Sequence, residues 1–529
     1  MDDSTRSATA DVKKRAEYTS DYKAGQDNVT ILGLDVLNPV FSTSAFLILL
    51  FIATTLIFPA DAKEMLLGAR TWSIETFDWL FLISGNIFVL FCLALIVLPV
   101  GKIRLGGKTA TPDFNRMSWF SMLFAAGMGI GLMFWSVAEP VAYYTDWYGT
   151  PLNVAANTPE AASLAMGATM YHWGLHPWAI YGVVALALAF FTYNKGLPLT
   201  IRSAFYPLLG ERVWGPIGHV IDIVAVLATI FGLATSLGLG ASQAAGGLSF
   251  LFDIENNITT QIVIIAGVTS IAIFSVVRGL DGGVKLLSNI NMLIAGILLL
   301  FVIVVGGVSG FLGHFFGILS SYAESIIPLS NPVGREDQTW YHGWTIFYWA
   351  WWISWSPFVG MFIARISKGR TVREFLMAVL LVPTLVTAVW MAAFGGNALD
   401  QVQGQIGALA NGVGDVSLAM FQMLENLPLT EITSALAIIL VLVFFITSSD
   451  SGSLVIDSIT AGGKVDAPVP QRIFWAVLEG LIAAVLLYGG GSEALTALQA
   501  GAVTVGLPFT IILLLMCVSL YKGLKSEVY

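Results

Sequence analysis

Residues 349–357, Trp-Ala-Trp-Trp-Ile-Ser-Trp-Ser-Pro, place four tryptophans within seven positions of an apolar stretch. Lipid does not require tryptophan, whereas an indole face attracts a cation, and desolvated aromatic cages for quaternary ammonium groups gain about 2 kcal/mol or more per contact. The alternative is an aromatic belt at headgroup level. Trp344, Tyr341 and Tyr348 lie toward the outer end of the same segment and are expected to serve as that belt. The pattern favours a membrane helix that carries a cation-binding surface.

The composition around this stretch is that of a membrane protein. Hydrophobic residues make up 56% and charged residues 11% of the 529 residues, whereas soluble domains contain about 25% charged residues. A run of roughly twenty apolar residues can cross a bilayer. Twelve such runs are expected at residues 38–58, 79–99, 117–138, 171–191, 219–248, 260–277, 287–311, 341–364, 374–395, 432–449, 472–489 and 497–520. We therefore predict an all-α polytopic membrane protein with twelve transmembrane helices.

The positions of Lys and Arg predict the orientation, because basic residues are retained on the cytoplasmic side. Of the 25 Lys and Arg residues, only Lys63, Arg70 and Arg335 fall in loops of the opposite side. Both termini are thus expected in the cytoplasm, with residues 1–37 as a disordered polar tail and 522–529 as a short tail. The net charge of −9 comes largely from the tails and outer loops and indicates no nucleic-acid partner.

Two of the predicted spans contain sequences that interrupt helices. The third contains Gly127-Met128-Gly129-Ile130-Gly131, where each glycine costs roughly 1 kcal/mol relative to alanine. The eighth contains Ile353-Ser354-Trp355-Ser356-Pro357, where proline removes a hydrogen-bond donor. Close helix packing is the alternative for the glycines, but paired interruptions in the two halves of a transporter point to its binding site. The expected parts are two accessory helices at 38–100, a first five-helix repeat at 117–312, an outer amphipathic helix at 313–330, and an inverted second repeat at 341–521, each repeat opening with a broken helix.

Two other classes of protein compete with a transporter. His172 and His176 are four residues apart, a spacing that can chelate a metal, so an intramembrane metal enzyme is one rival. No neighbouring glutamate base of the H-E-x-x-H kind accompanies them, so a packed or hydrogen-bonded pair is the default and no enzyme activity is expected. A non-transporting sensor of osmotic strength is the other rival. Glu139, at the outer end of the third span, is expected to contact backbone or a gate rather than substrate.

Three long motifs are similar to those of the betaine/choline/carnitine transporter family. They are residues 127–134 (GMGIGLMF), 172–181 (HWGLHPWAIY) and 349–362 (WAWWISWSPFVGMF), and shorter ones follow at 364–367 and 447–451. The resemblance extends from about residue 30 to residue 521. It implies a five-plus-five inverted repeat after two extra helices, import of compatible solutes for osmoprotection, no cofactor, and a homotrimer in the inner membrane.

The resemblance also implies a substrate site. The residues that it assigns are Trp173, Trp178, Tyr181 and Trp352 of an aromatic box, Trp351, Trp355 and Phe362 along the path beside it, and Ser236 as a polar contact. Trp178 and Tyr181 are three apart and share a helix face, which agrees with this assignment. Unpaired backbone N–H groups at Gly127, Gly129 and Gly131 would suit the carboxylate of a zwitterion.

Gly131 bears on the choice of substrate. Proton-coupled choline carriers of the family have Asp at this position, which supplies a counter-charge for a bare cation. Because an unpaired charge in the membrane is costly, Gly131 favours a zwitterion such as glycine betaine. The alternative is a proton-coupled or exchange carrier of choline, carnitine, ectoine or dimethylsulfoniopropionate.

Sodium is the coupling ion that the resemblance implies. Its main site would consist of the carbonyls of Ala125 and Met128 and the hydroxyls of Thr447 and Ser448, since hard cations prefer oxygen ligands. A second site would use Thr229 and Phe358, but Leu233 stands where sodium-coupled relatives have another threonine. Leucine cannot coordinate sodium, so this second site is expected to be weak or absent. The expected partners are then a small zwitterionic solute, sodium and membrane lipid.

Overall fold

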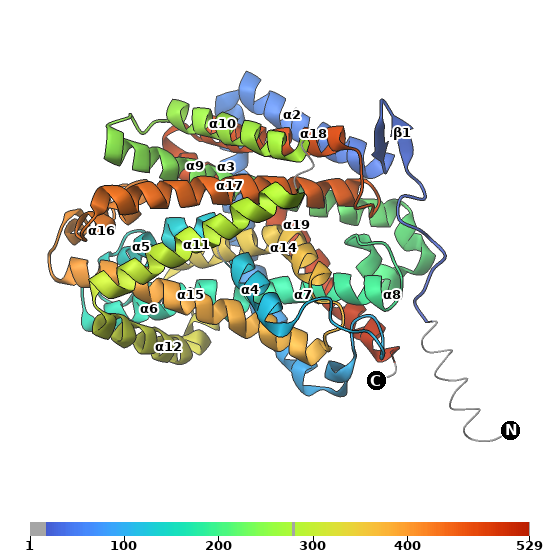
Figure 1. Cartoon of the computed structure of the whole chain (residues 1–529), viewed down its shortest axis with the longest axis horizontal. Coiled ribbons are helices and arrows are strands. Elements are labelled where there is room, and N and C mark those ends of the chain that lie inside the picture. Colours follow the sequence, from blue (N-terminus) through green and yellow to red (C-terminus); the bar gives the residue numbers. More distant parts are fainter. Residues whose placement is uncertain (1–16, 128, 278–280, 528–529) are drawn as a thin grey trace.

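The structure, a computed structural model, describes residues 17–127, 129–277 and 281–527, and these residues are nearly all helical (Figure 1). The long helices are α2 (Asn38–Ile57), α3 (Pro59–Val97), α9 (Pro216–Phe252), α10 (Ile258–Val277), α11 (Asp281–Gly306), α12 (Val308–Ser330), α15 (Val372–Gln403), α17 (Thr430–Thr460), α18 (Val469–Gly490) and α19 (Ala494–Lys525). Around them lie α4 (Arg116–Gly127), α5 (Ile130–Thr145), α6 (Pro159–Trp173), α7 (Leu175–Tyr193), α8 (Tyr206–Leu209), α13 (Gln338–Trp340), α14 (Ile346–Arg365) and α16 (Ala419–Glu425). One hairpin of β1 (Val29–Ile31) and β2 (Leu34–Val36) precedes them.

All twelve predicted apolar runs fall on these helices. In the part of the chain that the structure describes, nine helical stretches are long and apolar enough to cross a membrane, and one of them, Val469–Lys525, contains both α18 and α19. Their length and composition make the chain a multi-pass membrane protein. The count of twelve spans stays a prediction.

The glycine-rich interruption is present. α4 ends at Gly127 and α5 begins at Ile130, with Gly129 in an extended conformation (φ −168°, ψ −179°) before α5. Met128 lies outside the described residues. Helix ends leave main-chain groups without intrahelical partners, so carbonyls of this kind at the end of α4 and N–H groups of this kind at the start of α5 come close together.

The second predicted interruption is wrong. α14 continues through Pro357 as one helix. Proline has no N–H to offer the carbonyl of Ile353, but Ser356 Oγ donates to this carbonyl at 2.6 Å instead. The main-chain acceptor is therefore satisfied and the helix passes the proline without opening. The departure from α-helical geometry lies earlier, in the π-helical turn Tyr341–Thr345.

Residues 17–37, for which the sequence predicts disorder, are ordered. Leu37 N donates to Thr460 O at 2.8 Å, and Lys464 Nζ forms an ion pair with Asp35. These contacts attach the hairpin to the end of α17. The segment is too polar to form a core of its own, and its order comes from distant partners. Asp35 pairs with Lys464, 429 positions away, and Tyr22 stacks on the ring of Trp214.

Helix packing between the two predicted repeats is reciprocal. α14 packs against α7 and α5 against α15, α11 against α17 and α19 against α9, and α10 against α17 and α18 against α9. When the five helices of each predicted repeat are matched in order, each contact has a counterpart with the repeats exchanged. A two-fold relation between the repeats would produce this pattern.

The predicted outer amphipathic segment at 313–330 falls on α12, which packs against α6 and α15. Tyr322 and Leu329 are buried in that contact, whereas Phe316 and Ile327 are exposed. Large exposed apolar side chains on its free face suit lipid better than water. In Figure 1 this helix lies at the lower edge of the bundle, beside α6.

Candidate substrate site

Four aromatic rings from α6, α7 and α14 surround a small cavity of about 50 Å³. Trp173 and Trp352 meet edge to face with ring centroids 4.9 Å apart. Trp178 and Tyr181 are 5.3 Å apart, and Tyr181 lies 6.3 Å from Trp352. The structure thus brings all four predicted box residues together. We call Trp173, Trp178, Tyr181 and Trp352 the cage, because converging π faces are what a quaternary ammonium group requires.

A kink between α6 and α7 makes this convergence possible. Trp173 and Trp178 are five residues apart and would not share a face on a straight helix. Gly174 departs from helical geometry (φ −99°, ψ −127°) between the two helices. A Cβ atom at this glycine would lie 2.6 Å from Met170 O. The main chain can therefore turn tightly here only without a side chain, and both indoles then reach the cavity.

The start of α5 also lines the cavity, next to the rings. Gly129 and Gly131 both line it, whereas Gly127 is the last residue of α4. A Cβ atom at Gly131 would lie 2.6 Å from Trp351 Cη2 and 3.0 Å from Trp173 Cη2. Gly131 therefore has a packing role that the sequence does not reveal. It lets two indoles approach the helix N-terminus.

Fixed acceptors hold the indole N–H groups around the cavity. Trp352 Nε1 donates to His172 O at 2.9 Å, and Trp351 Nε1 donates to Ser236 Oγ at 3.2 Å. Trp355 Nε1 donates to Gly232 O at 2.9 Å. Ser236, predicted as a polar substrate contact, lines the cavity but also holds Trp351.

The sequence does not assign Glu139 to this site, yet its carboxylate bonds directly to the cage. Trp173 Nε1 donates to Oε2 at 2.7 Å and Tyr348 Oη donates to the same oxygen at 2.5 Å. Tyr143 Oη donates to Oε1 at 2.8 Å, and His172 Nδ1 lies 3.0 Å from Oε1. The predicted backbone contact of Glu139 is thus replaced by side-chain contacts. A charged residue within an apolar span is the signal that could have identified it.

The aromatic-belt prediction for the start of α14 is wrong. Tyr341, Trp344 and Tyr348 are all at most 3% exposed and face other helices. Trp349 is also buried and stacks on His176 at 5.1 Å, away from the cage. Tyr348, expected to contact headgroups, stacks at 5.6 Å on Trp352. Neighbours distant in sequence decide which face of this helix is covered.

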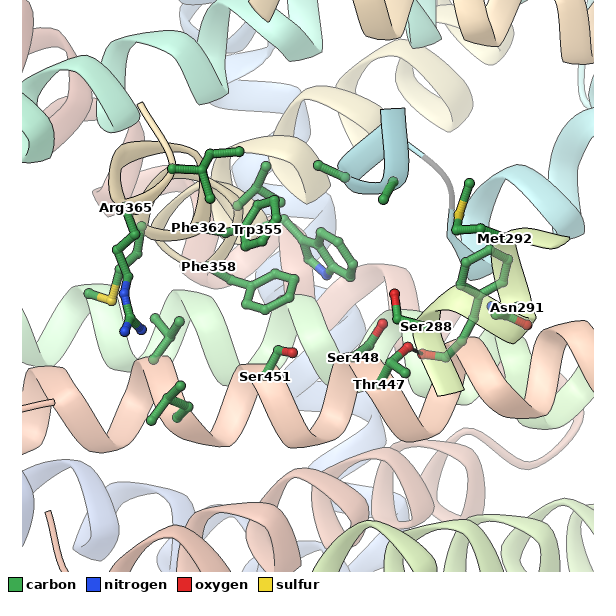
Figure 2. A pocket seen from close by; sticks show the side chains of 18 of the residues that line it. Ser288, Asn291, Met292, Trp355, Phe358, Phe362, Arg365, Thr447, Ser448 and Ser451 are labelled. Carbon is green, nitrogen blue, oxygen red and sulfur yellow. Dashed lines mark hydrogen bonds between the residues drawn. The ribbon is translucent and has the colours of Figure 1, made fainter. Parts of the chain in front are cut away.

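A larger cavity of about 510 Å³, which we call the inner cavity, adjoins the cage. Trp355, Val359 and Ala126 line both cavities, so the two meet at these residues. Figure 2 shows aromatic side chains of α14 on one side and hydroxyl side chains of α17 on the other: Trp355, Phe358 and Phe362, and Thr447, Ser448 and Ser451. Phe362, predicted to lie along the substrate path, lines this inner cavity but not the cage cavity.

Three of the four residues predicted for the main sodium site line the inner cavity: Ala125, Thr447 and Ser448. The fourth, Met128, lies outside the described residues. Thr447 Oγ1 donates to Val443 O at 3.0 Å, which leaves its lone pairs available to a cation. The free carbonyl end of α4 and the hydroxyls of α17 are thus a donor set that fits a hard cation.

The residues predicted for the second sodium site are not brought to one cavity. Phe358 lines the inner cavity. Thr229 is buried, donates to Ala225 O at 2.7 Å, and lines neither the cage cavity nor the inner cavity. For the metal-enzyme rival, no group of three His, Cys, Asp or Glu side chains that could hold a metal occurs among the described residues.

Comparison with known proteins gives one consistent family. The family model described as BCCT, betaine/carnitine/choline family transporter, matches residues 39–529. The chain is 65% identical to glycine betaine transporter 1 of Vibrio parahaemolyticus, over 98% of this chain and 99% of that protein. It is 62% identical to a glycine betaine/proline/choline/ectoine transporter of the same organism, over 97% of this chain and 92% of the relative. A glycine betaine transporter of Bacillus subtilis is 45% identical over 89% and 91% of the two chains.

Proposed function

This chain belongs to the betaine/carnitine/choline transporter family and is a transporter rather than an enzyme, and we propose that it imports a zwitterionic quaternary ammonium solute together with sodium. The solute is glycine betaine or a close analogue. The observation that carries this proposal is the cage, four aromatic rings around a cavity that the N-terminus of α5 also lines.

The two ends of a betaine match the two sides of this cavity. The rings of the cage attract the quaternary ammonium group. The free N–H groups at the start of α5 favour a carboxylate, because a helix N-terminus carries unpaired donors and a partial positive charge. The names of relatives at 65% and 45% identity, both glycine betaine transporters, support the same substrate. The relative at 62% identity is also named for choline, proline and ectoine, so these belong in any substrate panel.

Sodium would bind where the end of α4 faces α17. The free carbonyls of α4 and the hydroxyls of Thr447 and Ser448 are the oxygens that would hold it. Since Gly129 and Gly131 follow in the same interruption and line the cage cavity, an ion that orders the end of α4 would also order the wall of the substrate site. This linkage is the physical basis of the proposed coupling.

Alternating access is supported by cavities on both sides of the cage. The inner cavity adjoins the end of the cage toward Phe362. A second cavity of about 510 Å³, which we call the outer cavity, is lined by Trp135, Trp344 and Glu493 among others. Trp135 packs against Trp344 at 5.1 Å and against Tyr348 at 6.3 Å, and these packed rings would form the closed outer gate. The reciprocal packing of the two helix sets supports an inverted repeat that could exchange these two arrangements. A homotrimer in the inner membrane, with cytoplasmic termini, completes the proposal.

Uptake into proteoliposomes tests the function directly. Purified protein should accumulate labelled glycine betaine against its gradient when sodium is higher outside, and accumulation should stop when an ionophore collapses the sodium gradient. Protein-free vesicles and an equal potassium gradient are the controls. Full uptake without sodium would contradict the coupling, and binding without accumulation would favour the osmotic sensor.

A further inference from the structure

The cage has a buried carboxylate directly behind it. Glu139 is 0% exposed, and its two oxygens accept from side chains of three helices. The donors are Tyr143 of α5, His172 and Trp173 of α6, and Tyr348 of α14. Trp173 is a member of the cage, and Tyr348 stacks on another member, Trp352.

These contacts suit an ionised carboxylate. Each of the four partners can donate, and an ionised carboxylate only accepts, at both of its oxygens. A protonated carboxyl group would instead carry a hydrogen of its own, which would face groups that already donate to the carboxylate. His172 Nε2 lies 2.9 Å from Thr345 Oγ1, which can donate to it, so a neutral ring with its proton on Nδ1 satisfies both sides of the imidazole.

No strong cation neutralises this charge. Among the residues that the structure describes, no Lys or Arg forms an ion pair with Glu139, and His172 is the one titratable base in contact with it. Burial in a low-dielectric environment lengthens the reach of an unscreened charge. The negative charge of Glu139 therefore extends to the cage cavity.

Trp173 transmits this charge to the cavity. Its N–H donates to the carboxylate at 2.7 Å, while the indole lines the cavity. An indole whose N–H donates to an anion gains electron density on its ring, and a more negative π face attracts a cation more strongly. The ring is thus both held in place and polarised by the same contact.

We propose that Glu139 is the counter-charge of the cage and thereby sets how well the site holds quaternary ammonium cations that have no carboxylate of their own. The charge stands one layer behind the rings, whereas Gly131 cannot hold a side chain because Trp351 and Trp173 occupy that space. This inference rests on the proposed function, because it requires that the cage binds quaternary ammonium groups.

Ligand-induced changes in tryptophan fluorescence of purified protein, at constant sodium, test the inference with two probes. Tetramethylammonium carries only the cation, and glycine betaine carries the cation and a carboxylate. The wild-type chain should bind both. Glu139→Gln should weaken tetramethylammonium on the order of tenfold, because a buried unit charge is lost, and glycine betaine by a clearly smaller factor, because the lost charge also repelled its carboxylate.

Two further variants separate the charge from mere support of the rings. Glu139→Asp keeps the charge and should keep the wild-type ratio of the two affinities even if both fall. Glu479→Gln removes another fully buried carboxylate, on α18, whose contact is Ser449 and which does not line the cage cavity, and it should leave the ratio unchanged. Equal weakening of both ligands by Glu139→Gln would show a structural role and overturn the inference.

One measurement requires no variant. In the wild-type chain, tetramethylammonium should displace glycine betaine, and failure to displace it at high excess would overturn the inference while leaving the zwitterion importer intact. If the wild-type chain bound neither probe, the proposed function itself would fail.

Discussion

Trp352 faces the cage cavity and is tied to α6 through His172 O. We expect Trp352→Leu to weaken the apparent affinity for glycine betaine about thirtyfold, because a desolvated cation–π contact is worth about 2 kcal/mol. The concentration dependence of uptake in proteoliposomes measures this change.

Trp349→Leu is the matched control for Trp352→Leu. Trp349 is on the same helix but does not line the cage cavity, and it packs against His176, Tyr171 and His172. Its loss should lower thermal stability while the folded fraction keeps its affinity. An unchanged affinity in Trp352→Leu would remove this residue from the cage.

The two glycines of the cavity wall differ in what a methyl group would meet. At Gly131 an added Cβ would run into Trp351 and Trp173, whereas at Gly129 nothing lies within 4 Å. We expect Gly131→Ala to weaken binding of every quaternary ammonium ligand at least tenfold, since indole rings are displaced from their contacts. Gly129→Ala, in an extended conformation that any residue adopts, should stay within a few-fold of wild type. Fluorescence titration distinguishes them, and equal effects would contradict the packing role.

Whether the role of a residue can be predicted depends on the sequence motif around it. Trp173, Trp178, Tyr181 and Trp352 stand in long, specific motifs, and all four reach the cage. The contacts of Glu139 could not be predicted, because three of its four partners come from helices far along the chain, as the separations of 34 and 209 residues to Trp173 and Tyr348 show. The sequence reveals a charged residue in a span but not what it contacts.

Among the elements, the pair α4 and α17 should govern sodium dependence. Thr447→Ala combined with Ser448→Ala should abolish the sodium dependence of uptake, because two of the proposed hard oxygens are lost. Thr229→Ala should matter much less, since this hydroxyl bonds within its own helix. Wild-type uptake should show a Hill coefficient for sodium near one. A measured stoichiometry of two sodium ions would contradict this assignment.

The β1–β2 hairpin should detach in acid. Partial burial alone would raise the pKa of Asp35, but hydrogen bonds from Lys464 and Asn28 outweigh it and lower this pKa below its usual value. The ion pair then contributes stability above the usual pKa of aspartate, and this contribution is lost as pH falls through the lowered pKa. Hydrogen exchange of residues 29–37, corrected for intrinsic rates, should rise in acid.

Asp35→Asn should produce the same rise in hairpin exchange at neutral pH. Asp21→Asn, at an exposed position of the same segment, is the control and should not. Protection that persists in Asp35→Asn would show that the main-chain contacts of the hairpin suffice.

α14 shows why an element boundary can escape a sequence rule. Proline within a span predicts an interruption, whereas nothing in the sequence indicates that the neighbouring Ser356 compensates for the missing N–H. The hydrogen bond from Ser356 Oγ to Ile353 O, which replaces the missing main-chain donor, is visible only in the structure. The glycine interruption was predictable, because three glycines remove helix propensity without adding any replacement contact.

For the whole molecule, the inner cavity and the outer cavity, lined by Trp135 and Trp344, should open to opposite sides of the membrane. Cys92 and Cys517 are both buried, so introduced cysteines can be followed against a low background. A membrane-impermeant thiol reagent should label Ser451→Cys, in the inner cavity, only from the cytoplasmic side, and Ser492→Cys, in the outer cavity, only from the other. Reversed sidedness would refute the predicted orientation.

Ligands should change these labelling rates. Sodium and glycine betaine together should alter the rate at one position or both, because they shift the population between states open to either side. Constant rates at both positions would contradict alternating access.

The hydrogen bonds that hold the indoles of Trp173, Trp351, Trp352 and Trp355 also affect the entropy of binding. A large side chain that must settle on binding costs about 0.5–1.5 kcal/mol in lost rotamer freedom. Here hydrogen bonds within the protein already fix the rings, so an arriving solute meets a preorganised receptor and little of this freedom is lost. Small solutes with few contact atoms can then be held firmly without a large rearrangement of side chains.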